Sequence, residues 1–406
     1  MPYVKRDIEP NIESWIDERE IVAIRGPRQS GKTTLLNNLK DKIAKNPNND
    51  VFYISFEDDL VRLKFEENCK EFIKSFTGAK KAYFLLDEVQ YVNDIGKKLK
   101  LIFDSFENIK IIISGSSSFE LTTLGKYLVG RIVFFDLLPF SFVEFLRAKG
   151  ERYERIYLET AIDIEKIDLR KNLFLDELNM LLHEYLTYGG FPRVVLQMDN
   201  NKKKELIGSM FSTYVEKDLV ARFGNRYRDR SVIVLKTLAH MMGSVVNYES
   251  LANESGLKNK EMREILPLLQ DSFVISIIKP FHRNIVTELR KNPKIYFVDF
   301  GFRNYLLGMF DNIVFDSMYE NFICNQMKMK YGVKYWRTTA KTEIDFIVEG
   351  KELIPIEVRT SKKITRALRS FVHTYAIKNA VVANLGTAEK EMIEGCDVFA
   401  VPFAYF

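Results

Sequence analysis

A chain of 406 residues is too long for one ordinary domain, and two to four domains are expected. Its 46% hydrophobic and 13% aromatic residues are enough for several packed cores. The formal net charge of +5 is compatible with nucleic-acid binding but excludes the extreme charge of a histone-like protein. Three scattered cysteines exclude a disulfide framework, so a cytoplasmic protein is expected. The N-terminus, MPYVKRDIEP, lacks the apolar core of a signal peptide, and no apolar run would span a bilayer, so no membrane partner is expected.

The first predicted strand, residues 21–26, runs directly into a phosphate-binding loop. Residues 26–33 read GPRQSGKT and fit the pattern G-x-x-x-x-G-K-[ST] in full. The glycines let the backbone close around a phosphate, and the following helix adds its positive N-terminal end. We expect Lys32 to reach the β- and γ-phosphates of ATP and the Thr33 hydroxyl to bind Mg²⁺. The predicted nucleotide contacts are Gly26, Pro27, Arg28, Gln29, Ser30, Gly31, Lys32, Thr33 and Thr34.

Two more predicted strands follow, in the segments 51–58 and 82–90, and the apolar run of the second ends in Asp87 and Glu88. Asp87 is placed to hold Mg²⁺ through water, and Glu88 to orient and deprotonate the attacking water. A helix N-cap or a surface acid is the alternative for Glu88. One strand lies between the loop strand and the acid-ending strand, which resembles the additional-strand ATPases rather than kinases or G-proteins.

The segment after the second acid predicts a fourth strand with a polar end and then a fifth strand. KIIISGSSS, residues 110–118, offers Ser114 or Ser116 as a sensor of the γ-phosphate, with a helix N-cap as the alternative. LVGRIVFFDLLPFSFVEFL, residues 128–146, predicts a strand, a proline break and an amphipathic helix. Arg131 precedes that strand. It would contact a γ-phosphate in cis or from a neighbouring subunit, or would be a surface or sheet-edge arginine.

Five motifs in this order narrow the assignment. GPRQSGKTT, LLDEVQ, SGSSS, GR…LPFSFVEFL and YGGFPRVV resemble the archaeal and bacterial AAA-type ATPases that carry a C-terminal domain of uncharacterised function. The resemblance covers most of the chain and implies ATP and Mg²⁺ as cofactors. It implies an α/β fold with a P-loop three-layer sandwich at residues 1–150 and a helical lid at 151–228. A winged helix-turn-helix at 229–285 and a restriction-endonuclease-like α/β domain at 286–406 would follow.

The middle of the chain is predicted to be helical. Residues 172–222 place apolar side chains at helical spacing, and Gly189 with Gly190 is expected to end one helix. Arg193 and Arg222 would contact phosphate or a neighbouring subunit, with a solvated surface charge as the alternative.

Residues 231–279 predict helix, helix, tight turn, helix and strand, which resembles a winged helix-turn-helix. DNA contact is the first interpretation, and packing on the core or self-association is the alternative. Residues 221–230 add four arginines just before this region. The DNA-contacting side chains would be Lys258, Asn259, Lys260 and Arg263 on the third helix and Lys279, Arg283, Arg290, Lys291 and Lys294 around the wing.

The C-terminal region begins with a predicted strand, a turn at Gly301 and a helix, and then a helix at residues 317–331 that carries Glu320. Three strands follow, and the last two contain Asp345 and Glu357. This layout resembles the PD-(D/E)XK nuclease superfamily. By that resemblance, Glu320, Asp345 and Glu357 would converge on one or two Mg²⁺ or Mn²⁺ ions that activate water.

Two departures from that nuclease pattern bear on activity. Arg359 stands where a lysine is expected, and a guanidinium is a poor proton relay. Pro355 removes a hydrogen-bond donor from the last strand, which predicts a sheet edge or a bulge. Either Glu320, Asp345, Glu357 and Arg359 form a working catalytic centre, or the fold is inactive and its acids pair with Arg337, Arg359 or Lys362.

The sequence therefore predicts a Mg²⁺-dependent ATPase, with Lys32 and Glu88 as catalytic residues, that couples nucleotide state to DNA binding or processing. ATP and DNA are the expected partners, and a homo-oligomer is the expected assembly. A signalling or scaffold switch whose C-terminal domain binds protein partners is the main alternative. A transcription regulator that uses only the winged helix is a third.

Overall fold

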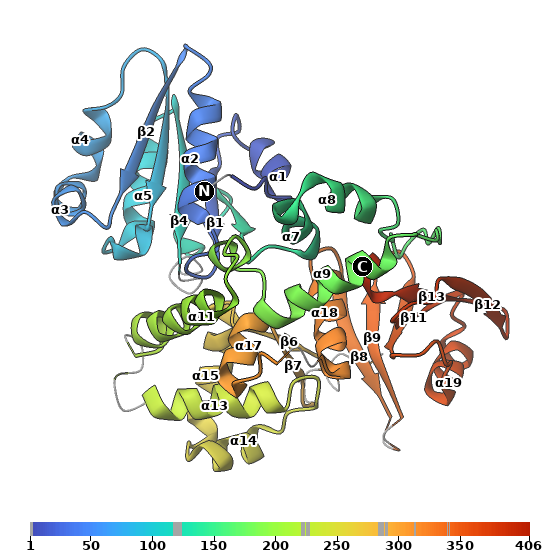
Figure 1. Ribbon diagram of the computed structural model, residues 1–406. Coiled ribbons are helices and arrows are strands. Elements are labelled where there is room, and N and C mark those ends of the chain that lie inside the picture. The colour runs from blue at the N-terminus through green and yellow to red at the C-terminus, as the bar shows by residue number, and fades with distance from the viewer. Residues whose placement is uncertain are drawn as a thin grey trace. The chain divides into compact units, whose positions relative to one another are not determined.

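The chain divides into two units in the computed structural model (Figure 1). The first unit holds residues 1–139 and 271–273, and the second holds residues 140–270 and 274–406. The structure describes residues 3–116, 124–220, 224, 228–282, 288, 291–311, 314–338, 340 and 342–406. The predicted phosphate contacts Arg222, Arg283 and Arg290 lie outside these residues.

A parallel five-stranded sheet forms the centre of the first unit, in the order β2-β3-β4-β1-β5. Its strands are largely continuous apolar runs, as expected when helices cover both faces of a parallel sheet. The predicted strands are confirmed, and β4 lies in space between the loop strand β1 and the acid-ending strand β3. The strands are β1 Ile21–Arg25, β2 Asn49–Ser55, β3 Lys81–Asp87, β4 Ile109–Gly115 and β5 Ile132–Asp136.

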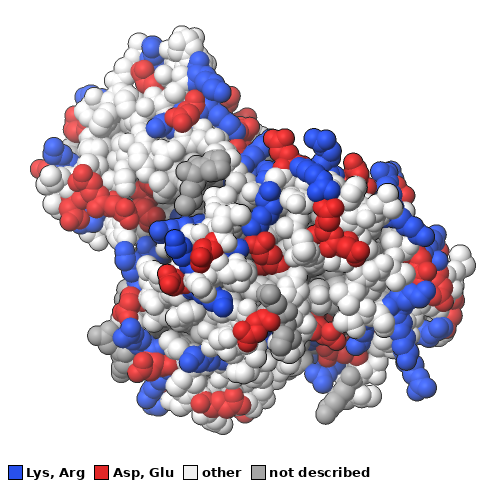
Figure 2. Space-filling model, in the orientation of Figure 1, with Lys and Arg blue, Asp and Glu red and all other residues white. Residues whose placement is uncertain are grey.

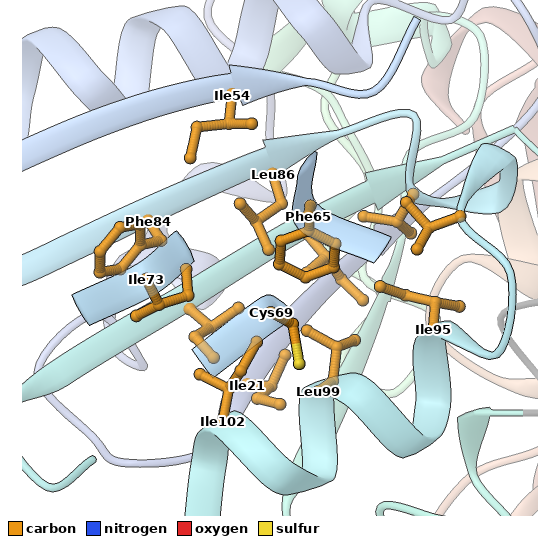
Figure 3. Close-up of a cluster of buried hydrophobic side chains, with 14 of the residues drawn as sticks. Ile21, Ile54, Phe65, Cys69, Ile73, Phe84, Leu86, Ile95, Leu99 and Ile102 are labelled. Atoms are coloured by element: carbon orange, nitrogen blue, oxygen red, sulfur yellow. The ribbon is translucent and has the colours of Figure 1, made fainter. Parts of the chain in front are cut away.

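Helices cover both faces of this sheet because alternate strand residues point to opposite sides. On one face, α1 (Glu9–Glu13) and α2 (Lys32–Ile43) bury apolar side chains against Val22 and Ile24 of β1. On the other face, Ile21 and Phe84 of the strands meet Phe65, Ile73 and Leu99 from three helices (Figure 3). Those helices are α3 Asp59–Glu67, α4 Cys69–Lys74 and α5 Ile95–Ser105. The three-layer α/β sandwich is therefore confirmed.

The second unit begins with helices. Ser141 and Glu144 form a capping box that starts the first of them, α7, and Gly189 (φ 78°) ends α9 as predicted. The helices are α7 Phe142–Lys149, α8 Glu151–Leu158, α9 Leu175–Tyr188, α10 Pro192–Val195 and α11 Asn200–Tyr214, and a π-helical segment, η2, continues over Val215–Val220.

Three helices and a two-stranded antiparallel sheet follow, in the order predicted from the sequence. They are α13 (Arg228–His240), α14 (Tyr248–Ser255), α15 (Asn259–Asp271), β6 (Ile275–Ile278) and β7 (Lys294–Phe297). Gly256 (φ 64°) makes the left-handed turn after α14.

The turn predicted at Gly301 is wrong. Gly301 lies in the first turn of α17 (Phe300–Leu307), and the Asp299 side chain caps that helix by accepting from the N–H of Phe302. A Cβ atom at position 301 would lie 2.5 Å from the carbonyl oxygen of Tyr188. Glycine therefore serves close packing here and not a change of chain direction.

The C-terminal part is a six-stranded mixed sheet, in the order β12-β13-β11-β10-β9-β8. Leu368 and Phe371 of α19 pack against Ile344 and Ile347 of β9, and α18 packs against β7 to β10. The elements are α18 Asp316–Lys328, β8 Gly332–Arg337, β9 Glu343–Glu349, β10 Leu353–Val358, α19 Arg366–Tyr375, β11 Asn379–Asn384, β12 Glu389–Ile393, β13 Cys396–Pro402 and the 3-10 turn η4 Phe403–Tyr405.

Pro355 does not mark a sheet edge, because β10 lies between β9 and β11. The parallel register with β11 starts at Ile356, one residue after the proline. The irregularity lies one strand away, where the β8–β9 register shifts between Lys334 and Trp336. In the part of the chain that the structure describes, no helix is long and apolar enough to cross a membrane.

Candidate nucleotide site and acidic cluster

The phosphate loop connects the carboxyl end of β1 to the start of α2. Gln29 (φ 64°) and Gly31 (φ 99°) adopt left-handed conformations, and such turns form the concave nests of N–H groups that bind anions. A Cβ atom at Gly26 would overlap the carbonyl oxygen of Leu137, which follows β5. Glycine is therefore required at position 26 for the loop to approach its neighbouring strand.

Lys32 lies inside this loop and is almost completely buried. Its Nζ atom donates hydrogen bonds to the carbonyl oxygens of Gly26 (3.0 Å) and Pro27 (2.9 Å). Arg6, which the sequence analysis missed, donates to the carbonyl oxygen of Ser30 at 2.9 Å. The Ser30 hydroxyl is buried and has no hydrogen-bond partner among the described residues. The loop is thus held by Lys32, from the start of α2, and by Arg6, from the segment before α1.

Thr33 and Asp87, the predicted Mg²⁺ ligands, are brought together by the fold. The Thr33 hydroxyl donates to Oδ2 of Asp87 at 2.7 Å. The Tyr53 hydroxyl donates to the same oxygen at 2.8 Å, and the Ser114 hydroxyl donates to Oδ1. Burial and the hydrogen bond to Asp87 raise the pKa of Tyr53. A hydroxyl and a carboxylate at this distance fit Mg²⁺, which binds few protein oxygens and takes its other ligands from phosphates and water.

Glu88 follows directly after β3 and has a left-handed backbone (φ 56°) at the start of the 3-10 turn Val89–Tyr91, called η1. The side-chain amide of Gln90 in this turn donates to Oε2 of Glu88 and, at 3.1 Å, to the hydroxyl of Ser116. The Ser116 N–H donates back to Oε1 of Gln90 at 3.3 Å. The alternative, in which Ser114 or Ser116 caps a following helix, concerns residues 117–123, which lie outside the described part of the chain. Gln90 was not singled out from the sequence, although it belongs to the quoted motif LLDEVQ.

Arg131 does not reach the phosphate loop of its own chain. It precedes β5, whose first residue, Ile132, pairs with Ile21 at the start of β1. Arg131 therefore lies at the amino edge of the parallel sheet, whereas the loop leaves the carboxyl edge. Its guanidinium forms an ion pair with Asp104 (Nε to Oδ1, 3.1 Å). The predicted contact in cis is thus wrong, and the sheet-edge alternative describes this arginine.

In the second unit, Glu320 of α18 contacts a buried lysine rather than a second predicted acid. Nζ of Lys294 lies 2.9 Å from Oε1 of Glu320 and 2.5 Å from Oε1 of Glu343. The Tyr296 hydroxyl donates to the same Glu320 oxygen. Lys294 is only 1% exposed, so the predicted contact of this side chain with DNA phosphates is wrong.

Asp345, on β9, lies near Lys294 and Glu320 and also contacts the backbone of β10. The Val358 N–H donates to Oδ2 of Asp345 at 2.8 Å. Burial and the negative charge of Glu320 raise the pKa of Asp345 to about 7, and the positive charge of Lys294 opposes that rise.

Glu357 is fully buried on β10 and takes a different partner. Its Oε1 accepts from the hydroxyl of Thr365, the N-cap of α19, and its Oε2 has no hydrogen-bond partner among the described residues. Burial raises the pKa of this carboxyl. Arg359, two residues on, is exposed, and its backbone N–H donates to Ala383.

The predicted three-acid metal site is not formed. Within the described ranges, no group of three or more His, Cys, Asp or Glu side chains is arranged to hold a metal ion. The physical reason is that the Lys294 ammonium contacts Glu320 and Glu343, while Glu357 bonds to Thr365. The alternative pairing partners Arg337 and Lys362 instead contact Glu343 and Glu389.

The predicted DNA-contacting side chains are partly at the surface. Lys258, Lys260 and Arg263 near the start of α15 are exposed, and the Arg263 guanidinium lies over the Tyr248 ring. Figure 2 shows Lys and Arg interspersed with Asp and Glu over the visible face. Of the other cations that the sequence analysis singled out, those exposed are Arg193, Arg228, Arg230, Lys279 and Lys291. Asn259 is half-buried.

Three family models match successive parts of the chain. Residues 18–146 match an AAA domain. Residues 179–312 match a domain of unknown function, DUF8612, and residues 309–406 match another, DUF4143. The first unit therefore contains an AAA-type P-loop ATPase domain, as expected from its motifs and its strand order.

Similar proteins come from bacteria and archaea. An uncharacterized protein of Haemophilus influenzae is 28% identical over 83% of this chain and 82% of its own length. One of Methanocaldococcus jannaschii is 27% identical over 86% and 77%. Among solved structures, AMPPCP-bound DnaA of Aquifex aeolicus is 15% identical with a TM-score of 0.33, and covers 66% of this chain and 88% of that one. At this similarity no property of DnaA transfers to this chain.

Proposed function

We propose that the protein hydrolyses ATP in a Mg²⁺-dependent reaction at the phosphate loop. The observation that carries this proposal is the 2.7 Å hydrogen bond between Thr33 and Asp87. It brings the phosphate loop together with the acid at the end of β3. Lys32 would bind the β- and γ-phosphates, and Thr33 with Asp87 would hold the ion. Mg²⁺, when bound, would neutralise charge on the phosphates.

Glu88 is the proposed general base. It follows the Mg²⁺-binding Asp87 by one residue, at the carboxyl edge of the sheet where ligands bind in open α/β folds. In this role its carboxylate orients a water molecule and accepts a proton from it. Ser116, at the end of the neighbouring strand β4, would sense the γ-phosphate.

We propose that nucleotide state is coupled to DNA binding by the second unit. The α13–α14–α15–β6–β7 segment would act as a winged helix, with exposed Lys258, Lys260 and Arg263 on DNA phosphates. The order α18-β8-β9-β10-α19-β11 supports a PD-(D/E)XK-like domain. Because Lys294 pairs with Glu320 and Thr365 bonds to Glu357, that domain would bind DNA without cutting it. The helical lid predicted at residues 151–228 stays a prediction.

ATP turnover tests the first part of the proposal. Lys32→Ala and Glu88→Gln are expected to abolish hydrolysis, while Lys40→Ala, a partly exposed lysine of the same helix, leaves it intact. Unchanged turnover in Glu88→Gln would refute the role of Glu88 as general base. A wild-type protein without turnover would refute the ATPase proposal.

DNA binding and cutting test the second part. The protein is incubated with branched, single-stranded and duplex DNA, with Mg²⁺ or Mn²⁺, with and without ATP. We expect binding that weakens steeply as salt rises, because phosphate contacts release counterions, and we expect no cutting. Cutting that disappears in Glu357→Ala would show an active nuclease and would contradict the role assigned to Lys294.

A switch that binds protein partners is the second candidate. The interspersed charges of the visible face (Figure 2) favour it, since no broad basic surface appears there. No measurable DNA binding at low salt, with intact ATP turnover, would support this candidate over the first.

A further inference from the structure

Gln90 joins the ends of two neighbouring strands next to the proposed reaction centre. Its amide nitrogen donates both to Glu88, directly after β3, and to the hydroxyl of Ser116, directly after β4. Its amide oxygen accepts from the Ser116 N–H. Both ends of the side-chain amide are therefore occupied, and Gln90 fixes the distance between the Glu88 carboxylate and the tip of β4.

The local backbone explains why position 90 serves this purpose. Glu88 adopts a left-handed conformation, and the 3-10 turn Val89–Tyr91 begins directly after it. Val89 is fully buried in the core on one face of the sheet. The turn is thus held in place by packing, and Gln90 reaches Glu88 from a fixed position two residues away.

We infer that Gln90 is a positioning residue that sets the Glu88 carboxylate for proton abstraction and links its orientation to Ser116. A glutamate side chain at the start of a short turn can adopt several rotamers, and a hydrogen bond to one carboxylate oxygen selects among them. The other oxygen stays available for a water molecule. A shift of Ser116 on contact with a phosphate changes the Gln90 bonds and hence the position of Glu88. This inference rests on the ATPase function proposed above, and it adds which side chain orients the general base of that site.

Two variants separate the contacts of Gln90. Gln90→Leu has a similar size and makes no hydrogen bond. Gln90→Glu keeps an acceptor for the Ser116 N–H, cannot donate to Glu88 and places a second negative charge beside it. Asn93→Ala is the matched control, because Asn93 is an exposed amide on the same segment that uses only its backbone N–H and carbonyl in hydrogen bonds to other described residues. The measurements are kcat, the Kd of a fluorescent ATP analogue and the thermal unfolding midpoint.

We expect kcat to fall at least about 10-fold in Gln90→Leu and in Gln90→Glu, since a positioned general base contributes about 100-fold or more. The Kd for the nucleotide and the unfolding midpoint should stay at the values of Asn93→Ala, because a positioning role acts on the chemical step alone. Wild-type kcat in either variant would overturn the inference. So would a rise in Kd as large as the fall in kcat, which indicates general damage to the pocket. A wild-type protein that binds ATP but never hydrolyses it would instead refute the proposed ATPase function.

Discussion

The ammonium group of Lys294 lies 2.9 Å from Oε1 of Glu320, and both residues are held in the second unit by a strand and a helix. Burial alone would lower the pKa of Lys294, but the charges of Glu320, Asp345 and Glu343 outweigh it and raise that pKa. The lysine therefore stays protonated and is the buried cation that Glu320 and Glu343 share. An internal ammonium removes the electrostatic need for a divalent ion there.

Replacing Lys294 with methionine is expected to destabilise the protein by about 3–5 kcal/mol, because breaking a buried ion pair leaves uncompensated charge. The measurement is the free energy of unfolding in urea. Lys334→Met is the matched control. Lys334 also contacts two glutamates, Glu288 and Glu349, but it is 24% exposed, and its loss should cost about 1 kcal/mol. Equal losses in the two variants would contradict the structural role of Lys294.

Tyr53→Phe tests the surroundings of the proposed Mg²⁺ site. The Tyr53 hydroxyl donates to Oδ2 of Asp87 at 2.8 Å and so orients a proposed metal ligand. Loss of such a supporting hydrogen bond typically weakens metal binding about 10-fold or more. We expect the Mg²⁺ concentration for half-maximal ATP turnover to rise by about that factor. Tyr83→Phe removes a similar tyrosine–aspartate bond, to Asp17, and should leave the Mg²⁺ dependence unchanged.

The sequence was sufficient to predict the phosphate loop and the strands of the first unit because their signals are local. The loop pattern occupies eight consecutive residues, and the strands of the first unit are short apolar runs with acids or serines at their ends. The edge position of Arg131 was also readable: a residue that precedes a parallel strand lies at the opposite edge from the loops that follow the strands. That signal favours the sheet-edge alternative for Arg131 over the contact in cis.

The acidic cluster was not predictable in the same way. Lys294 and Glu320 meet because β7 and α18 pack together, and no spacing in the sequence encodes that contact. Tyr53 reaches Asp87 through the register of two neighbouring strands, in which Ser55 pairs with Asp87. Side chains that depend on sheet register or on packing between distant elements need the folded structure to be found.

Asp299→Asn is expected to change how stability depends on pH. Burial raises the pKa of Asp299 to about 6, although N–H groups of Gly190 and Phe302 donate to its carboxylate. A folded-state pKa above the unfolded value gives stability that is full below about pH 4 and is lost as pH rises through about 6. The shift of about two units corresponds to roughly 3 kcal/mol.

Urea unfolding between about pH 4.5 and pH 7 measures this dependence. In Asp299→Asn the fall in stability over that range should become smaller by the contribution of Asp299, while the contribution of Asp345, whose pKa is also raised, remains. The lost hydrogen bond lowers stability at every pH. Asp199 provides a control of opposite sign. It also caps a helix, but it is exposed and its pKa is lowered by the backbone N–H of Lys202, so its contribution is lost as pH falls. An unchanged slope in Asp299→Asn would contradict the assigned pKa.

Gly26→Ala should weaken nucleotide binding while most of the fold survives. The added Cβ atom would overlap the carbonyl oxygen of Leu137 and approach the Ser30 hydroxyl at 3.2 Å. Both neighbours belong to the loop or to the end of β5, so the loop must move and its N–H groups lose their arrangement around a phosphate. Gly78→Ala is the control in the same unit, because its Cβ atom would meet only Asp50 Oδ2, at 3.9 Å. We expect the Kd of a fluorescent ATP analogue to rise at least about 10-fold in Gly26→Ala and to stay unchanged in Gly78→Ala. Equal Kd values for the two variants would show that close approach at position 26 is not needed, and would remove the steric argument for this glycine.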